Sequence, residues 1–101
     1  MIQHIVLFKF KEGISSEKID EAFTDLEKLK ELIPGILSYS AGINSSPENI
    51  NRGYTHGFIM TFATAEERDV YLPHPEHEKV KEKLSPILAD DEGALVFDFE
   101  C

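Results

Sequence analysis

Hydrophobic and polar residues alternate along two stretches of the chain, residues 2–10 and residues 54–62. A period of two with many β-branched and aromatic residues is typical of β-strands. Residues 36–43 read as a weaker strand, softened by serine and glycine, and residues 94–100 as the last strand. In the first and third strands the even-numbered face is the more apolar: Ile2, His4, Val6, Phe8 and Phe10, and Tyr54, His56, Phe58, Met60 and Phe62.

Three helices are predicted between these strands. Apolar residues recur at helical spacing from Ile19 to Ile33, after an N-cap at Ser15 or Ser16 and before Pro34-Gly35. Thr64 and Glu67 form a capping box for a short helix through about residue 71. Pro75 suits the first turn of a further helix, in which His77, Val80 and Leu84 share one face. Residues 44–53 are polar and rich in turn-forming residues, which indicates a loop.

The order strand, helix, strand, strand, helix pair, strand predicts an α+β fold, a ferredoxin-like βαββαβ sandwich. Residues 1–101 are expected to form a single domain, near the commonest domain size. We expect the first and third strands to be parallel neighbours, with their even-numbered face under the helices.

The opposite face of the predicted sheet is also apolar. It would carry Ile5, Leu7, Ile59, Leu95, Phe97 and Phe99. Monomers rarely keep so large an apolar patch in water. Packing two such faces together in a symmetric pair would bury it, so we expect a homodimer.

The amino-acid composition limits the classes of molecule that this protein is expected to bind. Ten Lys and Arg against 19 Asp and Glu give a formal net charge of −9, which disfavours nucleic-acid and membrane surfaces. The one cysteine, Cys101, excludes an intrachain disulfide and CxxC metal sites. The apolar run at the start is too short for a membrane span and lacks the features of a signal peptide, so a cytoplasmic location is expected.

The candidate chemistry lies in the histidines. If the first and third strands are parallel, His4 and His56 lie at the same end and on the same face, and the helix that begins at Pro75 brings His77 over them. Tyr71 could join this cluster. A buried imidazole cluster suits proton transfer. The alternative for each histidine is a packing residue of the core, and for His74 a turn or helix-cap residue. Three histidines could also hold zinc, but no HExxH or HxH spacing is present, so we expect neither a metal nor a cofactor.

Four segments resemble one known family, the stress-responsive A/B-barrel (Dabb) domain. They are residues 4–11, 53–58, 69–77 and 96–100, in the family's order and spread over essentially the whole chain. The resemblance implies a dimeric α+β barrel built from two ferredoxin-like sheets.

One branch of that family, the plant polyketide cyclases, performs a cofactor-free aldol condensation. Resemblance to it makes His77 the general base and Tyr71 its partner, with His4 and His56 polarising substrate carbonyls. The tyrosine that the cyclases carry on their first helix is Leu26 here, which leaves an oily pocket lined by Val6, Phe23 and Leu26. His74 and Asp98 complete the candidate substrate-binding residues. Two functions stay open: a cofactor-free lyase or cyclase acting on a carbonyl compound, and a non-catalytic stress-response or ligand-binding protein.

Overall fold

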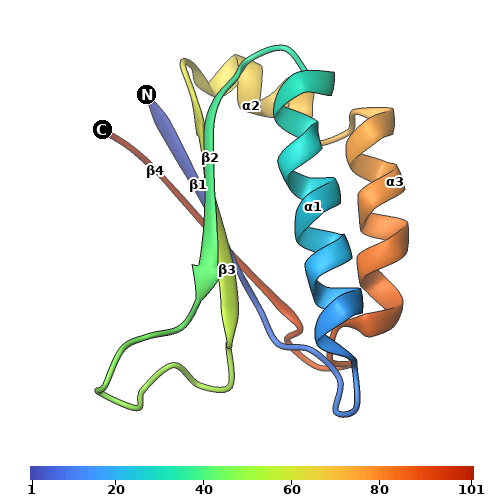
Figure 1. Cartoon of the computed structure of the whole chain (residues 1–101). Coiled ribbons are helices and arrows are strands. Elements are labelled where there is room, and N and C mark those ends of the chain that lie inside the picture. The colour runs from blue at the N-terminus through green and yellow to red at the C-terminus, as the bar shows by residue number, and fades with distance from the viewer.

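The computed structural model describes residues 1–101, and the chain forms a four-stranded sheet covered on one face by helices (Figure 1). The strands and helices follow in the order β1 (Ile2–Phe8), α1 (Ser16–Leu32), β2 (Ile36–Ile43), β3 (His56–Phe62), α2 (Ala65–Tyr71), α3 (Pro75–Leu84), a short 3₁₀ turn (Ser85–Ile87) and β4 (Ala94–Glu100). The predicted α+β ferredoxin-like architecture is therefore confirmed, with the helix pair resolved as α2 and α3.

The sheet order is β2-β3-β1-β4, and every neighbouring pair is antiparallel. The parallel pairing predicted for the first and third strands is wrong. α1 carries the chain back so that β2 starts at the same end as β1, and the loop after β2 then reverses the chain into β3. In the observed register Phe8 pairs with His56, and His4 pairs with Met60.

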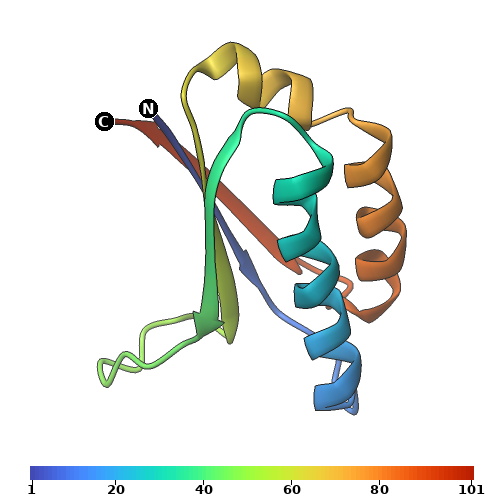
Figure 2. The same cartoon turned by 45° about the horizontal axis from the view of Figure 1, so that its top comes forward.

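The core lies between the helices and the even-numbered face of β1 and β3. Val6, Phe8, Phe58, Met60 and Phe62 are buried there, as the alternation predicted. α1 contributes Leu26 and Leu29 to the same core and α3 contributes Val80 and Leu84. Figures 1 and 2 show α1 and α3 side by side over the sheet, with α2 across the end where β3 stops.

The first and third strands are shorter than the alternation predicted. Beyond Phe8 the chain leaves the sheet, because the Lys9 amide donates to the Gly93 carbonyl and the Lys11 amide to the Ile87 carbonyl. Phe10 keeps only an isolated bridge to Leu88. These bonds draw the end of β1 toward the turn that precedes β4.

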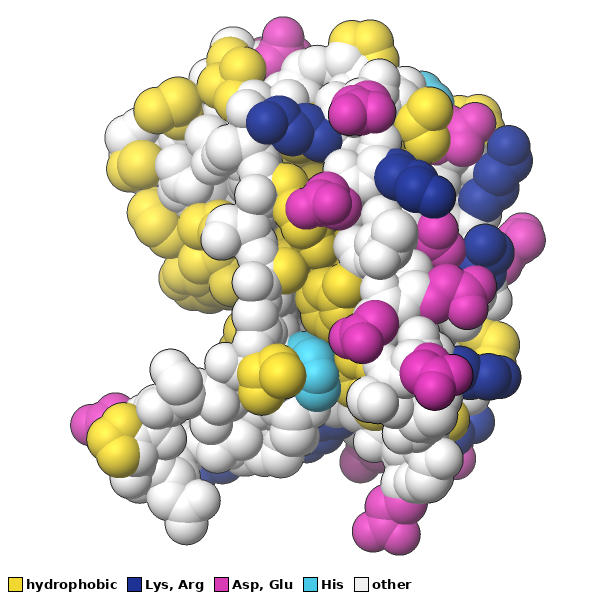
Figure 3. Space-filling view, in the orientation of Figure 1, with side chains coloured by type: hydrophobic (Ala, Val, Ile, Leu, Met, Phe, Trp, Pro, Cys, Tyr) yellow, Lys and Arg dark blue, Asp and Glu magenta, His cyan; other side chains and the backbone are white.

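The face of the sheet opposite the helices is uncovered. Leu95, Phe97 and Phe99 of β4 lie exposed there, and Phe97 leaves 63% of its surface in solvent. Figure 3 shows hydrophobic side chains gathered on the side of the molecule away from the helices. None of the helices has the length and apolar character needed to cross a membrane.

Candidate functional site

A groove of about 630 Å³ lies between α3 and the strands β1 and β4. Its wall is mostly apolar, with two histidines among the lining residues and a few polar side chains. The lining includes His4, Val6, Phe8, Leu26, Phe58, Leu72, His77, Val80, Leu84, Leu88 and Val96, with Lys81, Ser85 and Asp90. Pockets of this size and character hold small, partly apolar molecules.

His77 is held at the start of α3 by the break between the two helices. His74 caps α3, its Nδ1 accepting from the Glu76 amide, and Pro75 occupies the first turn. The His77 Nδ1–H donates to the Leu72 carbonyl at 2.9 Å, because a carbonyl can only accept. This bond fixes the tautomer and leaves Nε2 as the nitrogen with a free lone pair.

Burial lowers the pKa of His77, and the neighbouring Lys81 and His4 act in the same direction, against the Leu72 carbonyl and Glu78. A lowered pKa keeps the imidazole neutral at physiological pH. Neutral imidazole with a free Nε2 is the form that can take a proton from a bound molecule.

Tyr71 is the last residue of α2 and lies between the two histidines of the groove. Its ring stacks on His77 with centroids 4.2 Å apart and meets His4 edge-on at 5.7 Å. The side chain is fully buried and its hydroxyl has no hydrogen-bond partner. Burial raises the pKa of the phenol, so it stays protonated as a donor.

His4 is a buried polar residue of β1, with 4% of its side chain exposed. Its Nδ1 lies 2.8 Å from Oδ1 of Asp98, the residue directly opposite it on β4. The second Asp98 oxygen accepts from Arg68 Nη1 at 3.1 Å. Asp98, predicted as substrate-binding, therefore serves as the hydrogen-bond partner of His4. Arg68 was not predicted as part of the site.

His56 does not join His4 and His77, which corrects the predicted three-histidine pocket. It lies opposite Phe8, four residues along β1 from His4, which is about 13 Å at the usual rise of a strand. There its ring stacks on Phe23 and meets Phe10 edge-on. Burial lowers the pKa of His56, and Asp20 opposes the shift.

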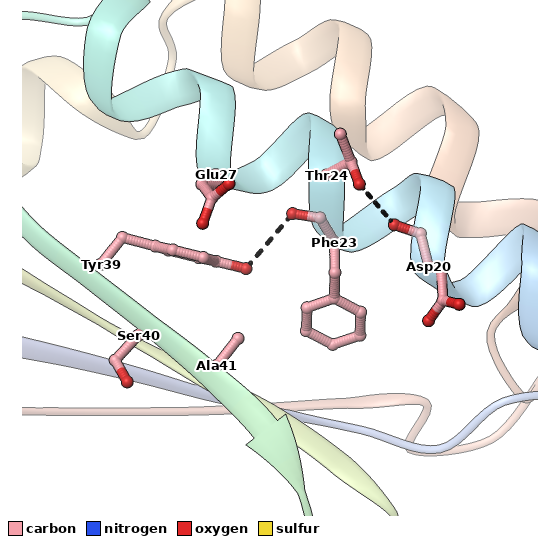
Figure 4. Close-up of a pocket in the computed structure, with 7 residues that line it drawn as sticks. All are labelled: Asp20, Phe23, Thr24, Glu27, Tyr39, Ser40 and Ala41. Carbon is pink, nitrogen blue, oxygen red and sulfur yellow. Dashed lines mark hydrogen bonds between the residues drawn. The ribbon is translucent and has the colours of Figure 1, made fainter.

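Phe23 also lies outside the histidine groove. It borders a second, polar hollow between α1 and β2, of about 520 Å³, with Asp20, Thr24, Glu27, Tyr39, Ser40 and Ala41 (Figure 4). The Tyr39 hydroxyl spans this hollow to the Phe23 carbonyl at 3.4 Å. Of the predicted oily lining, Val6 and Leu26 face the histidine groove and Phe23 does not.

Two further expectations concern His74 and metal binding. His74 is a helix cap, which is the alternative reading of this residue, and it does not line the groove. The structure brings no three His, Cys, Asp or Glu side chains together in an arrangement that could hold a metal ion. The groove thus offers an imidazole that can act as a base and a second imidazole held by a carboxylate, while the Tyr71 phenol lies buried beside both and does not line the groove.

The chain matches the profile of the stress responsive A/B barrel domain (Dabb) over residues 2–101. It is 34% identical to the stress-response A/B barrel domain-containing protein HS1 of Arabidopsis thaliana, over 98% of this chain and 88% of that protein. It is 30% identical to the olivetolic acid cyclase of Cannabis sativa, over 75% of each chain. A solved structure described as a dimeric ferredoxin-like protein, from Jannaschia sp., superposes with a TM-score of 0.88 at 28% identity, covering 99% of this chain and 98% of that one. The chain therefore belongs to the stress-responsive A/B-barrel (Dabb) domain family.

Proposed function

We propose that this protein is a homodimeric, cofactor-free enzyme of the lyase or cyclase type, in which His77 removes a proton next to a carbonyl group. The observation that carries the proposal is the hydrogen bond from His77 Nδ1–H to the Leu72 carbonyl. It leaves Nε2 as the only ring nitrogen able to accept a proton, at a position that lines the groove.

The neighbouring side chains suit this role. Tyr71 stacks on the base and meets His4 edge-on, and its unpaired hydroxyl is the donor that we propose for a substrate oxygen. Because that hydroxyl is buried and does not line the groove, the contact requires the ring to move toward the substrate when it binds. Val80 and Leu84 of α3, with Val6 of β1, form an apolar wall for the rest of the substrate. An apolar wall strengthens the electrostatic interactions that would stabilise an enolate. The similarity to olivetolic acid cyclase supports a reaction of the cyclase type.

The homodimer is the second part of the proposal. Leu95, Phe97 and Phe99 form a continuous exposed row on alternate positions of β4, next to Ile5 and Leu7 of β1. Pairing this face with a second copy would remove it from water, and the Jannaschia neighbour is itself described as dimeric.

The test is solvent-deuterium exchange at the carbon next to the carbonyl of small aldehydes and ketones, followed by proton NMR. We expect exchange with the natural sequence and a loss of about 10²–10⁴-fold in His77→Ala, the usual contribution of a general base. Lys79→Ala is the control, since this exposed residue of the same helix does not line the groove.

Exchange that persists in His77→Ala would disprove the assignment of the base. The second candidate function is ligand binding without turnover, favoured by the similarity to the stress-response protein HS1 over nearly the whole chain. It predicts that carbonyl compounds bind, that the natural sequence exchanges no protons, and that His77→Ala changes affinity alone.

A further inference from the structure

The polar hollow between α1 and β2 is separate from the histidine groove. Its volume is about 520 Å³, and it continues into a recess of about 190 Å³ that His56 lines. The hollow and the recess share Asp20, Phe23 and Ala41, and neither shares a lining residue with the groove beneath α3. A volume of this order is sufficient for a small molecule.

Two carboxylates stand on the helical side of the hollow. Asp20 and Glu27 lie on one face of α1, two turns apart, which is about 10 Å along the helix axis. Figure 4 shows them at the two ends of the hollow, with the Phe23 ring and the Tyr39 hydroxyl between them. Neither carboxylate takes part in an ion pair or a hydrogen bond. No Lys or Arg lines the hollow or the recess, so the two negative charges have no cation there.

The floor between the carboxylates is aromatic. The Phe23 ring stacks on His56 with centroids 5.7 Å apart, and the Tyr39 ring packs against Phe58 at the same distance. Figure 3 shows hydrophobic side chains at the bottom of the recess between the sheet and the helices, with acidic side chains on its helical rim. An ammonium group is attracted to the faces of such rings, and methylene groups gain from being covered by them.

Both carboxylates act on the groups of this floor. Burial raises the pKa of Tyr39 to about 12, and Glu27 acts in the same direction. Burial lowers the pKa of His56, and Asp20 opposes that shift. The two carboxylates are therefore close enough to the floor to attract a cation that lies on it.

We propose that this hollow binds a linear aliphatic diamine or polyamine, with one ammonium group at Asp20, another at Glu27, and the methylene chain over Phe23 and Tyr39. A single ammonium group cannot contact two carboxylates that lie two turns apart with a phenyl ring between them. A ligand that pairs with both must carry two positive groups joined by a chain. The inference does not rest on the proposed function, because the hollow and the histidine groove have no lining residue in common.

The test is titration of the full chain with spermidine at low ionic strength, by isothermal calorimetry and by ¹⁵N–¹H NMR of the backbone amides. We expect shifts confined to α1 and β2, at the amides of Phe23, Tyr39 and Ser40. Butylamine, which has one ammonium group, should bind at least about fivefold more weakly, the upper end of the effect of one exposed ion pair. Asp20→Asn combined with Glu27→Gln should weaken spermidine binding by at least about tenfold.

Matched variants separate the hollow from the general negative charge of the protein. Glu21→Gln with Glu66→Gln removes the same charge from exposed helical residues that do not line the hollow, and should change the affinity by less than about twofold. Tyr39→Leu removes the aromatic face and should weaken binding by about threefold. Tyr39→Phe keeps the ring and should bind spermidine as the natural sequence does.

The inference is overturned if the shifts spread over the whole acidic surface, or if the Glu21 and Glu66 pair of changes weakens binding as much as the Asp20 and Glu27 pair. Equal affinity for butylamine and spermidine would also overturn it, as would the same shifts from magnesium ion at equal concentration. A short lysine-rich peptide that shifts these signals when spermidine does not would mean that the hollow docks a protein segment instead. None of these readouts needs activity, so they are distinguishable from failure of the proposed function, which is read from deuterium exchange in His77→Ala.

Discussion

The buried hydroxyl of Tyr71 lowers the free energy of unfolding, because it has no hydrogen-bond partner, and this effect can be measured directly. The side chain is inaccessible to solvent and its oxygen has no partner. Leaving a buried donor unsatisfied costs about 1–3 kcal/mol. Tyr71→Phe removes that oxygen and keeps the ring, with its contacts to Phe62 at 5.2 Å, His4 at 5.7 Å and His77 at 4.2 Å. Tyr71→Phe should therefore be more stable than the natural sequence.

We expect a gain of about 1 kcal/mol, the lower end of that range, because the lost oxygen also leaves a small void. For a chain of this length this raises the melting temperature by about 4–8 °C. The assay is thermal unfolding by circular dichroism at one fixed protomer concentration, since the proposed dimer would make the melting temperature depend on concentration. Tyr39→Phe is the control, because that hydroxyl donates to the Phe23 carbonyl and its loss should not stabilise the fold.

A melting temperature of Tyr71→Phe at or below that of the natural sequence would refute the reasoning, and would mean that the hydroxyl is hydrogen-bonded in solution, for instance to a buried water. If the phenol also serves the reaction, the same variant should lose exchange activity while gaining stability. Strain of this kind is common at functional sites, where a group is kept unpaired for the ligand.

Two more predictions concern assembly and pH. Phe97→Asp places a charge in the exposed row of β4 and should convert the proposed dimer into a monomer in sedimentation velocity at micromolar concentration. Val70→Asp changes a similarly exposed apolar residue on α2 and should leave the assembly unchanged. A Phe97→Asp protein that is still a dimer would contradict the proposed interface. The lowered pKa values of His56 and His77 mean that the unfolded chain binds more protons than the folded one between the folded pKa and about pH 6.5, so stability should fall as pH drops through this window. Urea unfolding at several pH values checks this, and His77→Gln should reduce the slope; a slope that is unchanged or opposite in sign would contradict it.

The alternation of residues predicted the elements and the buried face correctly, because burial of one sheet face is a local property of the strand. The relative direction of β1 and β3 is set by how α1 and the loop at residues 44–55 return the chain, and strand parity carries no information on it. His56 was for this reason placed at the wrong end of the sheet.

His77 lies near His4, as predicted, but the prediction assumed parallel first and third strands, and the strands are antiparallel. α2 is only seven residues long and crosses the end of the sheet where β3 stops, so α3 begins beside the start of β1. Arg68 was missed because its partner Asp98 is 30 positions away along the chain, and a lone arginine on a short helix reads as surface. The alternation of side chains along β4 places Asp98 on the same face of the sheet as His4. This position under the helices is the signal that could have pointed to a buried partner for Asp98 such as Arg68.

The bond between His77 and Leu72 has a stereochemical consequence. The ring is pinned at Nδ1 by a backbone carbonyl and pressed flat against Tyr71, so it cannot turn over without breaking both contacts. Its free lone pair therefore has one direction in space. A prochiral carbon held in the groove would meet the base from one side only, and the handedness of the product would be set by the junction of two helices.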